Sequence, residues 1–169
     1  HGYQIVQDST EAQAIIVNTC AFIQSATEES LSVIFEALDT PQVQAGSARV
    51  VVAGCMPARY GDDLATSLTE VTTFVPCDRE RDIVSILDDL YPDRGICAHS
   101  QAFSSARSVC AYVKISDGCN RFCSYCAIPH IRGRYHSFSL EQIASDVTDA
   151  VSRGAREITL IAQDTGRWG

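Results

Sequence analysis

A continuous run of mainly β-branched residues, Arg49-Val-Val-Val-Ala53, is followed at once by the turn sequence Gly54-Cys-Met-Pro57. An apolar run of this length between turn residues is typical of a strand that is buried on both faces. A similar short run covers Ala14 to Val17, and another covers Thr72 to Val75. The three runs predict three buried strands.

Helical patterns alternate with these strands. Ser25-Ala-Thr-Glu28 has the form of a capping box and predicts a helix that stops at Thr40-Pro41. A weaker helix is predicted within residues 60–68, and Asp78 is predicted to cap a third helix with an apolar stripe. That stripe consists of Ile83, Ile86, Leu87 and Leu90. Strands that alternate with amphipathic helices predict an α/β fold, a doubly wound parallel sheet with helices on both faces.

A second domain is predicted after a linker, Pro92 to Ser108, which is rich in Gly, Ser and Ala. A strand at Ala111 to Ile115 and a strand at Glu157 to Ala162 flank a helix that the capping box Ser139-Leu-Glu-Gln142 opens and Gly154 ends. The helix is expected to turn four residues inward: Ile143, Val147, Ala150 and Val151. We therefore expect domains at residues 1–100 and 106–169, the second containing one βαβ unit.

Composition excludes several classes of protein. The chain has 169 residues, 46% hydrophobic and 20% charged, which is typical of a globular protein. No run reaches the roughly 18 apolar residues of a membrane helix, and no signal peptide is visible, so we expect a cytoplasmic protein without a membrane partner. Because His1 is not an initiator methionine, the natural chain is expected to begin further upstream.

Charge is distributed unevenly along the chain, whose formal net charge is −8. Residues 1–105 carry 15 acidic and 5 basic residues, whereas residues 106–169 carry 6 acidic and 8 basic residues. No acidic residue lies between Gly118 and Leu140. The second half is therefore the better place for an anionic ligand.

Three of the eight cysteines lie within eight residues, in Cys119-Asn-Arg-Phe-Cys123-Ser-Tyr-Cys126 directly after a predicted strand. This crowding favours metal ligation over a disulfide scaffold. A structural zinc site usually takes four ligands, whereas an iron–sulfur cluster held by three thiolates keeps one iron open. The spacing therefore predicts a 4Fe-4S cluster with an open iron. A structural zinc site completed by His130, in an interaction module that is not an enzyme, is the alternative.

Two further cysteines, Cys20 and Cys55, follow the first two predicted strands. The carboxyl ends of the strands are the edge at which open α/β sheets bind ligands. A second metal site at this edge is one interpretation, and the common burial of cysteine as a small apolar residue is the other. A flavodoxin-like carrier is disfavoured because no phosphate-binding glycine loop is present.

The cysteine spacing after a strand resembles the signature of the radical-SAM superfamily, which builds a partial TIM barrel. The resemblance implies that the open iron binds S-adenosylmethionine and that the reduced cluster generates a 5'-deoxyadenosyl radical. It also implies that Tyr125 lies along the adenine. By position only, Gln163 and Asp164 would meet the amino group of the methionine, since the Gly-Gly-Glu version of that motif is absent.

Val17-Asn-Thr-Cys20-Ala-Phe-Ile, and then Gly54-Cys-Met-Pro-Ala-Arg-Tyr60, resemble the N-terminal domain of the methylthiotransferase family. The resemblance implies a second 4Fe-4S cluster, held by Cys20, Cys55 and a cysteine upstream of His1. Cys77 is left out because the family usually has no cysteine there. Family members use S-adenosylmethionine both as methyl donor and as radical source, and depend on an electron donor such as flavodoxin or ferredoxin.

The family has two main bacterial branches. One modifies a tRNA adenosine, and the other modifies the β-carbon of an aspartate in small-subunit ribosomal protein uS12. Ile161-Ala-Gln-Asp-Thr165, Ser116-Asp-Gly-Cys119 and Ala127-Ile-Pro129 resemble the uS12 branch. We therefore expect uS12 as the substrate, with tRNA as the alternative, and we expect the rest of the barrel to lie beyond Gly169. No role is assigned to His130 or His136.

Overall fold

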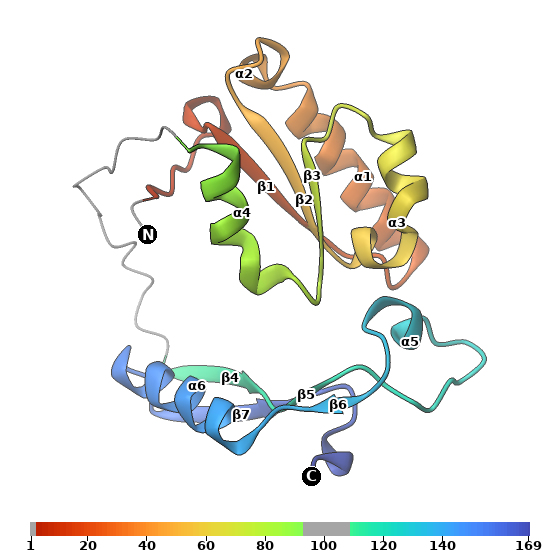
Figure 1. Ribbon diagram of the computed structural model, residues 1–169, viewed down its shortest axis with the longest axis vertical. Coiled ribbons are helices and arrows are strands. Elements are labelled where there is room, and N and C mark those ends of the chain that lie inside the picture. Colours follow the sequence, from red (N-terminus) through yellow and green to blue (C-terminus); the bar gives the residue numbers. More distant parts are fainter. Residues whose placement is uncertain (1–2, 93–108) are drawn as a thin grey trace. The chain divides into compact units, whose positions relative to one another are not determined.

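The computed structural model describes residues 3–92 and 109–169, and the chain divides into two compact units, His1–Gln101 and Ala102–Gly169 (Figure 1). Apart from Pro92, the predicted linker lies outside the described residues. In the first unit the elements are η1 (Ser9–Glu11), β1 (Ala14–Thr19), α1 (Gln24–Leu38), α2 (Pro41–Gln44), β2 (Arg49–Gly54), α3 (Cys55–Ser67), β3 (Thr73–Pro76), η2 (Glu80–Asp82) and α4 (Ile83–Leu90).

The three strands of the first unit form a parallel sheet in the order β1-β2-β3, which confirms the predicted α/β class. Thr19 of β1 pairs with Gly54 of β2, and Gly54 pairs with Pro76 of β3. All three strands therefore end at the same level. The central β2 is the most buried, because Val50, Val51 and Val52 are each 0% exposed.

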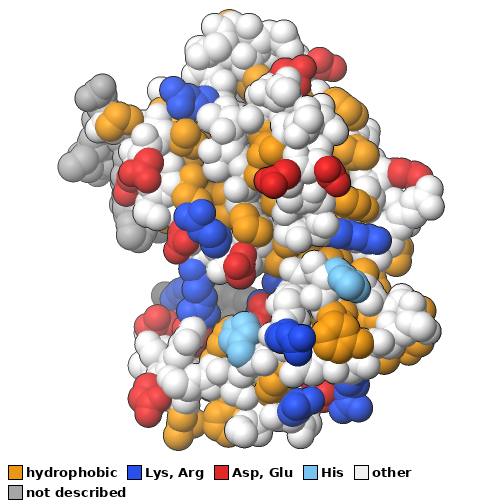
Figure 2. Space-filling view, turned by 45° about the vertical axis from the view of Figure 1, so that its right-hand side comes forward, with side chains coloured by type: hydrophobic (Ala, Val, Ile, Leu, Met, Phe, Trp, Pro, Cys, Tyr) orange, Lys and Arg blue, Asp and Glu red, His pale blue; other side chains and the backbone are white. Residues whose placement is uncertain are grey.

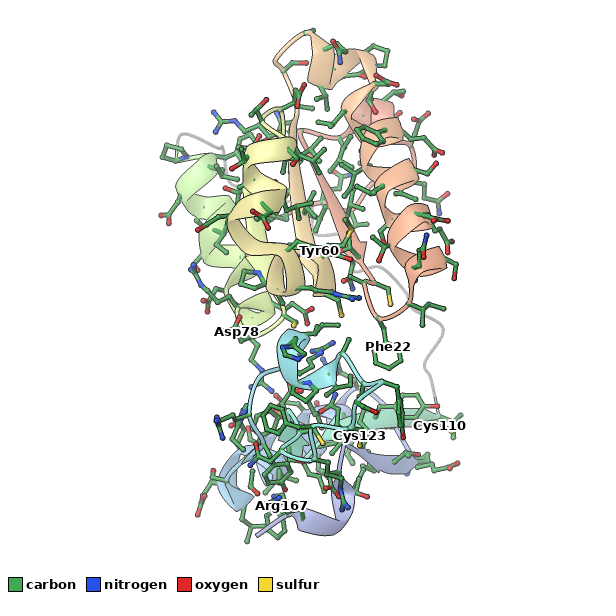
Figure 3. The ribbon with its side chains drawn as sticks, turned by 90° about the vertical axis from the view of Figure 1, so that its right-hand side faces the viewer. Phe22, Tyr60, Asp78, Cys110, Cys123 and Arg167 are labelled. Carbon is green, nitrogen blue, oxygen red and sulfur yellow. The ribbon has the colours of Figure 1, made fainter. Side chains whose placement is uncertain are left out.

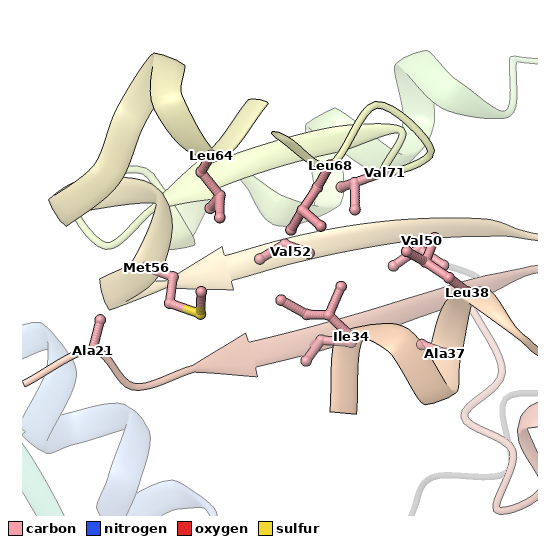
Figure 4. Close-up of a cluster of buried hydrophobic side chains, with 11 residues drawn as sticks. Ala21, Ile34, Ala37, Leu38, Val50, Val52, Met56, Leu64, Leu68 and Val71 are labelled. Carbon is pink, nitrogen blue, oxygen red and sulfur yellow. The ribbon is translucent and has the colours of Figure 1, made fainter. Parts of the chain in front are cut away.

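Helices cover both faces of this sheet, as the alternating pattern predicted. One core joins β1 and β2 to α1 and α3, and Figure 4 shows Ile34, Val52 and Met56 within it. The other core packs Val51 and Val75 against α4. The α4 stripe predicted from the sequence faces this second core, where Leu87 is buried and the other three residues are partly buried.

Two predicted helix starts are wrong. Thr27 N donates to the carbonyl of Ile23 at 3.1 Å, so α1 begins at Gln24 and Ser25 lies inside its first turn rather than capping it. Asp78 does not cap α4, because residues 80–82 first form η2, whose flanking Arg79 pairs with Asp82 at 3.2 Å. The sequence pattern predicted each helix within a few residues but did not identify the residue at which it begins.

The predicted turn at residues 54–57 is also shorter than expected. Only Gly54 is non-helical, with φ of 98°, and Cys55 already begins α3. The weak helix predicted at 60–68 is therefore the second half of α3, which kinks at Gly61 where φ is 46°.

The second unit contains the predicted βαβ arrangement. Its elements are β4 (Cys110–Lys114), β5 (Ser116–Asp117), α5 (Ile128–Ile131), β6 (His136–Ser137), α6 (Leu140–Ser152), β7 (Glu157–Ile161) and η3 (Thr165–Arg167). Strands β4 and β7 are parallel neighbours, and Val113, Ile115 and Ile143 form the core beneath α6. Ser139 caps α6 by accepting a hydrogen bond from Gln142 N, as predicted. Val151 is 54% exposed, so its predicted inward position is wrong.

Candidate iron–sulfur and cofactor site

Asp117 links three parts of the chain around the cysteine-rich segment between β5 and β6. Its Oδ1 accepts a hydrogen bond from Gly118 N at 2.9 Å, and its Oδ2 lies 3.0 Å from Lys114 Nζ and 3.7 Å from Arg132 Nη1. The Asp117 side chain is only 11% exposed. One nearly buried carboxylate therefore joins the end of β4, the start of the cysteine loop and the residue that follows α5.

Gly118 allows the two sides of this loop to approach each other. Its φ is 74°, and a Cβ at this position would lie 2.3 Å from the carbonyl oxygen of Arg134. Next to it, Cys119 N donates to Gly133 O at 3.2 Å, and Asn120 Oδ1 accepts from Tyr135 N at 3.0 Å. The close approach holds Cys119 against the returning chain and requires a glycine before it.

The three cysteines of the loop differ in exposure. Cys123, labelled in Figure 3, is exposed, whereas Cys119 and Cys126 are half-buried. Cys126 N donates to Cys123 O at 3.0 Å, so a tight turn joins the last two cysteines. Within residues 3–92 and 109–169, no three His, Cys, Asp or Glu side chains are gathered closely enough to hold a metal ion.

Arg121 connects this loop to the end of β7. Its Nε donates to Asp164 Oδ2 at 2.9 Å, and its Nη2 donates to Asp164 Oδ1 at 3.4 Å. The carboxylate raises the pKa of Arg121, and Cys119 and Cys123 raise it further through their charge. In return, the hydrogen bond from Arg121 lowers the pKa of Asp164 below its ordinary value. Arg121 is thus hydrogen-bonded to one predicted cofactor residue and interacts electrostatically with two of the predicted cluster cysteines.

The other predicted cofactor residues are not held in this way. Tyr125 is 89% exposed, and Gln163 is exposed between β7 and Asp164. Arginines lie over aromatic rings nearby, Arg134 at 5.7 Å from the Phe122 centroid and Arg167 at 5.4 Å from the Tyr135 centroid. The space-filling view shows Lys and Arg side chains beside hydrophobic ones on the second unit (Figure 2). Positive charge is therefore available to offset thiolates in the loop.

In the first unit, Cys20 and Cys55 come directly after Thr19 and Gly54, which are paired in the sheet. Gly54 permits this pairing because a Cβ there would lie 2.6 Å from both Asn18 Oδ1 and Thr19 O. Cys20 is exposed and Cys55 is half-buried. The parallel register thus brings both cysteines to the carboxyl edge of the sheet. Cys77 follows β3 at the same edge and is buried.

Comparisons with known proteins match two separate parts of the chain, one in each compact unit. Residues 1–76 match a family described as "Uncharacterized protein family UPF0004", and residues 113–166 match the Radical SAM superfamily. Three relatives, each named "Ribosomal protein uS12 methylthiotransferase RimO", come from Desulforamulus reducens, Geobacter sulfurreducens and a Thermotoga species. They are 36%, 37% and 36% identical over 100%, 99% and 99% of this chain, respectively.

The chain contains a UPF0004 domain and a radical-SAM domain, and along its whole length it is similar to methylthiotransferases. It spans 40% of the length of these methylthiotransferase relatives. The radical-SAM match begins within β4 and ends within η3, so it contains the cysteine loop and Asp164. The donor chemistry of the loop fits an iron–sulfur cluster, because three thiols lie on one short segment flanked by arginines.

Several residues that shape the cysteine loop and the strand ends were not assigned a role from the sequence. Gly118 and Gly54 allow close backbone approaches, and Asp117 binds Gly118 N, but the sequence showed these three residues only as parts of family-like stretches. Nothing in the sequence indicated the partner of Arg121, since Asp164 lies 43 residues away. No helix in the described ranges is long and apolar enough to cross a membrane.

Proposed function

We propose that the full-length protein is a radical-SAM methylthiotransferase that adds a methylthio group to the β-carbon of an aspartate in ribosomal protein uS12. Similarity along nearly the whole chain to relatives named for uS12 supports this substrate. The observation that carries the chemistry is the Arg121–Asp164 pair, which joins the cysteine loop to the end of β7. A tRNA adenosine remains the second candidate only through family resemblance.

In this proposal Cys119, Cys123 and Cys126 hold a 4Fe-4S cluster with one open iron. A reduced cluster held there would supply one electron for the cleavage of S-adenosylmethionine into methionine and a 5'-deoxyadenosyl radical. Asp117 and Gly118 hold the first of the three cysteines against the returning chain, and Arg121 offsets the negative charge of the thiolates.

Asp164 is proposed to accept hydrogen bonds from the amino group of the methionine moiety, and Gln163 is proposed to assist it. The Arg121 ion pair keeps Asp164 ionised and oriented toward the loop, which suits an acceptor of this kind. Tyr125, which is 89% exposed, offers its ring to the adenine.

Cys20 and Cys55 are proposed to hold a second 4Fe-4S cluster together with a cysteine outside this chain. The pairing of Thr19 with Gly54 supports the proposal, because it delivers both thiols to one edge of the sheet. We further propose a cytoplasmic location and reduction by a flavodoxin or ferredoxin.

The test uses the full-length protein, reconstituted without oxygen and supplied with S-adenosylmethionine and a reductant. Mass spectrometry would follow methylthiolation of uS12 and of tRNA in parallel reactions, after iron has been counted. We expect a modified uS12 aspartate and about eight irons per chain. Cys123→Ala should abolish product and lower the iron content, whereas Cys110→Ala, at the start of β4, should do neither. Product on tRNA alone would contradict the proposed substrate, and zinc without iron would contradict the radical mechanism.

A further inference from the structure

Cys20 presents an exposed thiol from a backbone that is fixed on both sides. Thr19, which precedes it, is 4% exposed, and Ala21, which follows it, is 0% exposed. Ser30, a buried residue of α1, accepts a hydrogen bond from Cys20 N at 3.1 Å and donates one to Cys20 O at 3.0 Å. A single hydroxyl therefore binds both polar backbone groups of Cys20.

The segment that carries Cys55 is tied to the same strand end. Thr19 Oγ1 donates to Ala53 O at 2.6 Å and accepts from Met56 N at 3.2 Å. Ala53 lies two residues before Cys55, and Met56 lies directly after it. The threonine hydroxyl therefore links the end of β1 to both sides of Cys55.

A third link joins the same two segments. Arg59 of α3 donates a hydrogen bond from Nη1 to the carbonyl oxygen of Ala21. Side chains from three elements, β1, α1 and α3, thus hold the chain around Cys20 and Cys55. The Cys20 thiol takes no part in these hydrogen bonds.

We infer that Ser30 and Thr19 are positioning residues that set the spacing of Cys20 and Cys55 before a cluster binds. The inference rests on the proposed second cluster and deepens it, because it assigns two residues that need not touch metal. Fixing the backbone of a ligand in advance reduces the conformational entropy that is lost on binding. Removing an outer partner of a metal ligand typically weakens metal binding about 10- to 100-fold.

The experiment isolates the first unit's site within the full-length protein. Cys119, Cys123 and Cys126 are replaced together by alanine, so that iron binds only through the remaining cysteines. In this parent, Ser30→Ala is compared with Ser32→Ala, a change on the same helix at an exposed serine whose hydroxyl contacts Glu36 at 3.4 Å. The measurements are iron per chain, the rate of iron loss to a chelator, and the electron paramagnetic resonance spectrum of the reduced cluster.

We expect Ser30→Ala to lose iron about tenfold faster than the parent and to show an altered spectrum, while Ser32→Ala matches the parent. Equal rates for the two serine variants would overturn the inference while leaving the second cluster in place. A parent that binds no iron would instead overturn the proposed second cluster, and the inference with it.

Thr19 provides an independent pair of variants in case Ser30→Ala impairs folding. Thr19→Val keeps the shape but removes both hydrogen bonds, whereas Thr19→Ser keeps the hydroxyl. We expect rapid iron loss with valine and near-parent retention with serine. If both variants retain iron equally well, with the apo-protein melting temperature lowered only in the valine variant, the role of Thr19 is structural alone.

Discussion

Arg121 and Asp164, 43 residues apart in the chain, are joined by two hydrogen bonds in one ion pair, of 2.9 and 3.4 Å. The arginine side chain is 68% exposed, whereas the carboxylate side chain is 13% exposed. Solvent therefore screens the arginine and weakens its contribution to stability. Its role is better understood as orientation of the less exposed carboxylate beside the cysteine loop.

Replacing Arg121 by alanine should weaken the binding of S-adenosylmethionine to the full-length protein several-fold, because Asp164 loses its orienting partner. Equilibrium dialysis with the reconstituted protein measures this directly. Arg153→Ala, at the exposed end of α6, is the control and should leave binding unchanged. Unchanged affinity in the Arg121 variant would exclude an orienting role.

The same pair predicts a defined pH dependence. Because the folded-state pKa of Asp164 is lowered by Arg121, any stabilisation from the pair is present above the unfolded-state pKa and is lost as pH falls through the folded-state pKa. Carboxyl NMR signals of Asp164 should therefore titrate below the ordinary aspartate range, and Arg121→Ala should return the midpoint toward that range. If the titration midpoint of Asp164 in the unsubstituted protein lay in the ordinary aspartate range, the ion pair would not be populated in solution.

Gly118→Ala should disrupt the cysteine loop. The added Cβ meets backbone atoms of Arg134 that cannot move cheaply, and φ of 74° is unfavourable for alanine. We expect a cost on the order of 3 kcal/mol from overpacking and backbone strain together. Gly133→Ala has a similar φ of 72° but open space around it, so about 1 kcal/mol is expected there. Chemical denaturation and iron content of both full-length variants test the difference.

Ser139→Ala should destabilise α6 by about 1 kcal/mol, because the serine accepts a hydrogen bond from Gln142 N at the helix start. Amide hydrogen exchange in the first turn of α6 should accelerate about fivefold. Ser25→Ala provides the contrast, since Ser25 lies within α1 and makes no cap. If Ser25→Ala accelerated exchange in the first turn of α1 equally, Ser25 would act as a cap after all, and the helix start seen in the structure would be contradicted.

Cys110 should react slowly with alkylating reagents despite its exposure. Its thiol donates a hydrogen bond to Glu157 Oε2 at 3.2 Å, which raises the pKa of the thiol and lowers the thiolate fraction at a given pH. Glu157→Gln should speed alkylation at mildly alkaline pH, as followed by mass spectrometry of the Cys110 peptide. An unchanged rate would mean that access, rather than the carboxylate, limits the reaction.

How much of this molecule could be predicted depends on the range of the interactions involved. The β-branched run ending at Ala53 predicted its strand because burial on both faces leaves a continuous apolar pattern. Ser139 was predicted correctly as a cap because capping is local, but the similar pattern at Ser25 failed when Ile23 supplied the first helical carbonyl. The two-residue strands β5 and β6 are too short for any periodicity.

The sequence predicted only those parts of the candidate site that follow from the positions of residues along the chain. Cysteine spacing predicted the loop as a cluster site, and the apolar runs predicted the two strands that Cys20 and Cys55 follow. The contacts of Arg121 with Asp164 and of Ser30 with Cys20 depend on how separate segments pack, which neither spacing nor local propensity contains. Gly118 and Gly54 illustrate the same limit, because a glycine's need for space depends on its neighbour in another segment.

Because Thr19 pairs in register with Gly54, the arrangement at this edge of the sheet depends more on the number of residues in β1 than on which residues they are. Side chains of a strand alternate between its two faces, so one residue inserted or deleted within β1 would turn Thr19 to the face opposite its present one. Conservative exchanges of Ile15 or Val17 could be absorbed by repacking, but no repacking restores a lost register. Among homologous chains, the number of residues between Ala14 and Cys20 should therefore vary less than their identities.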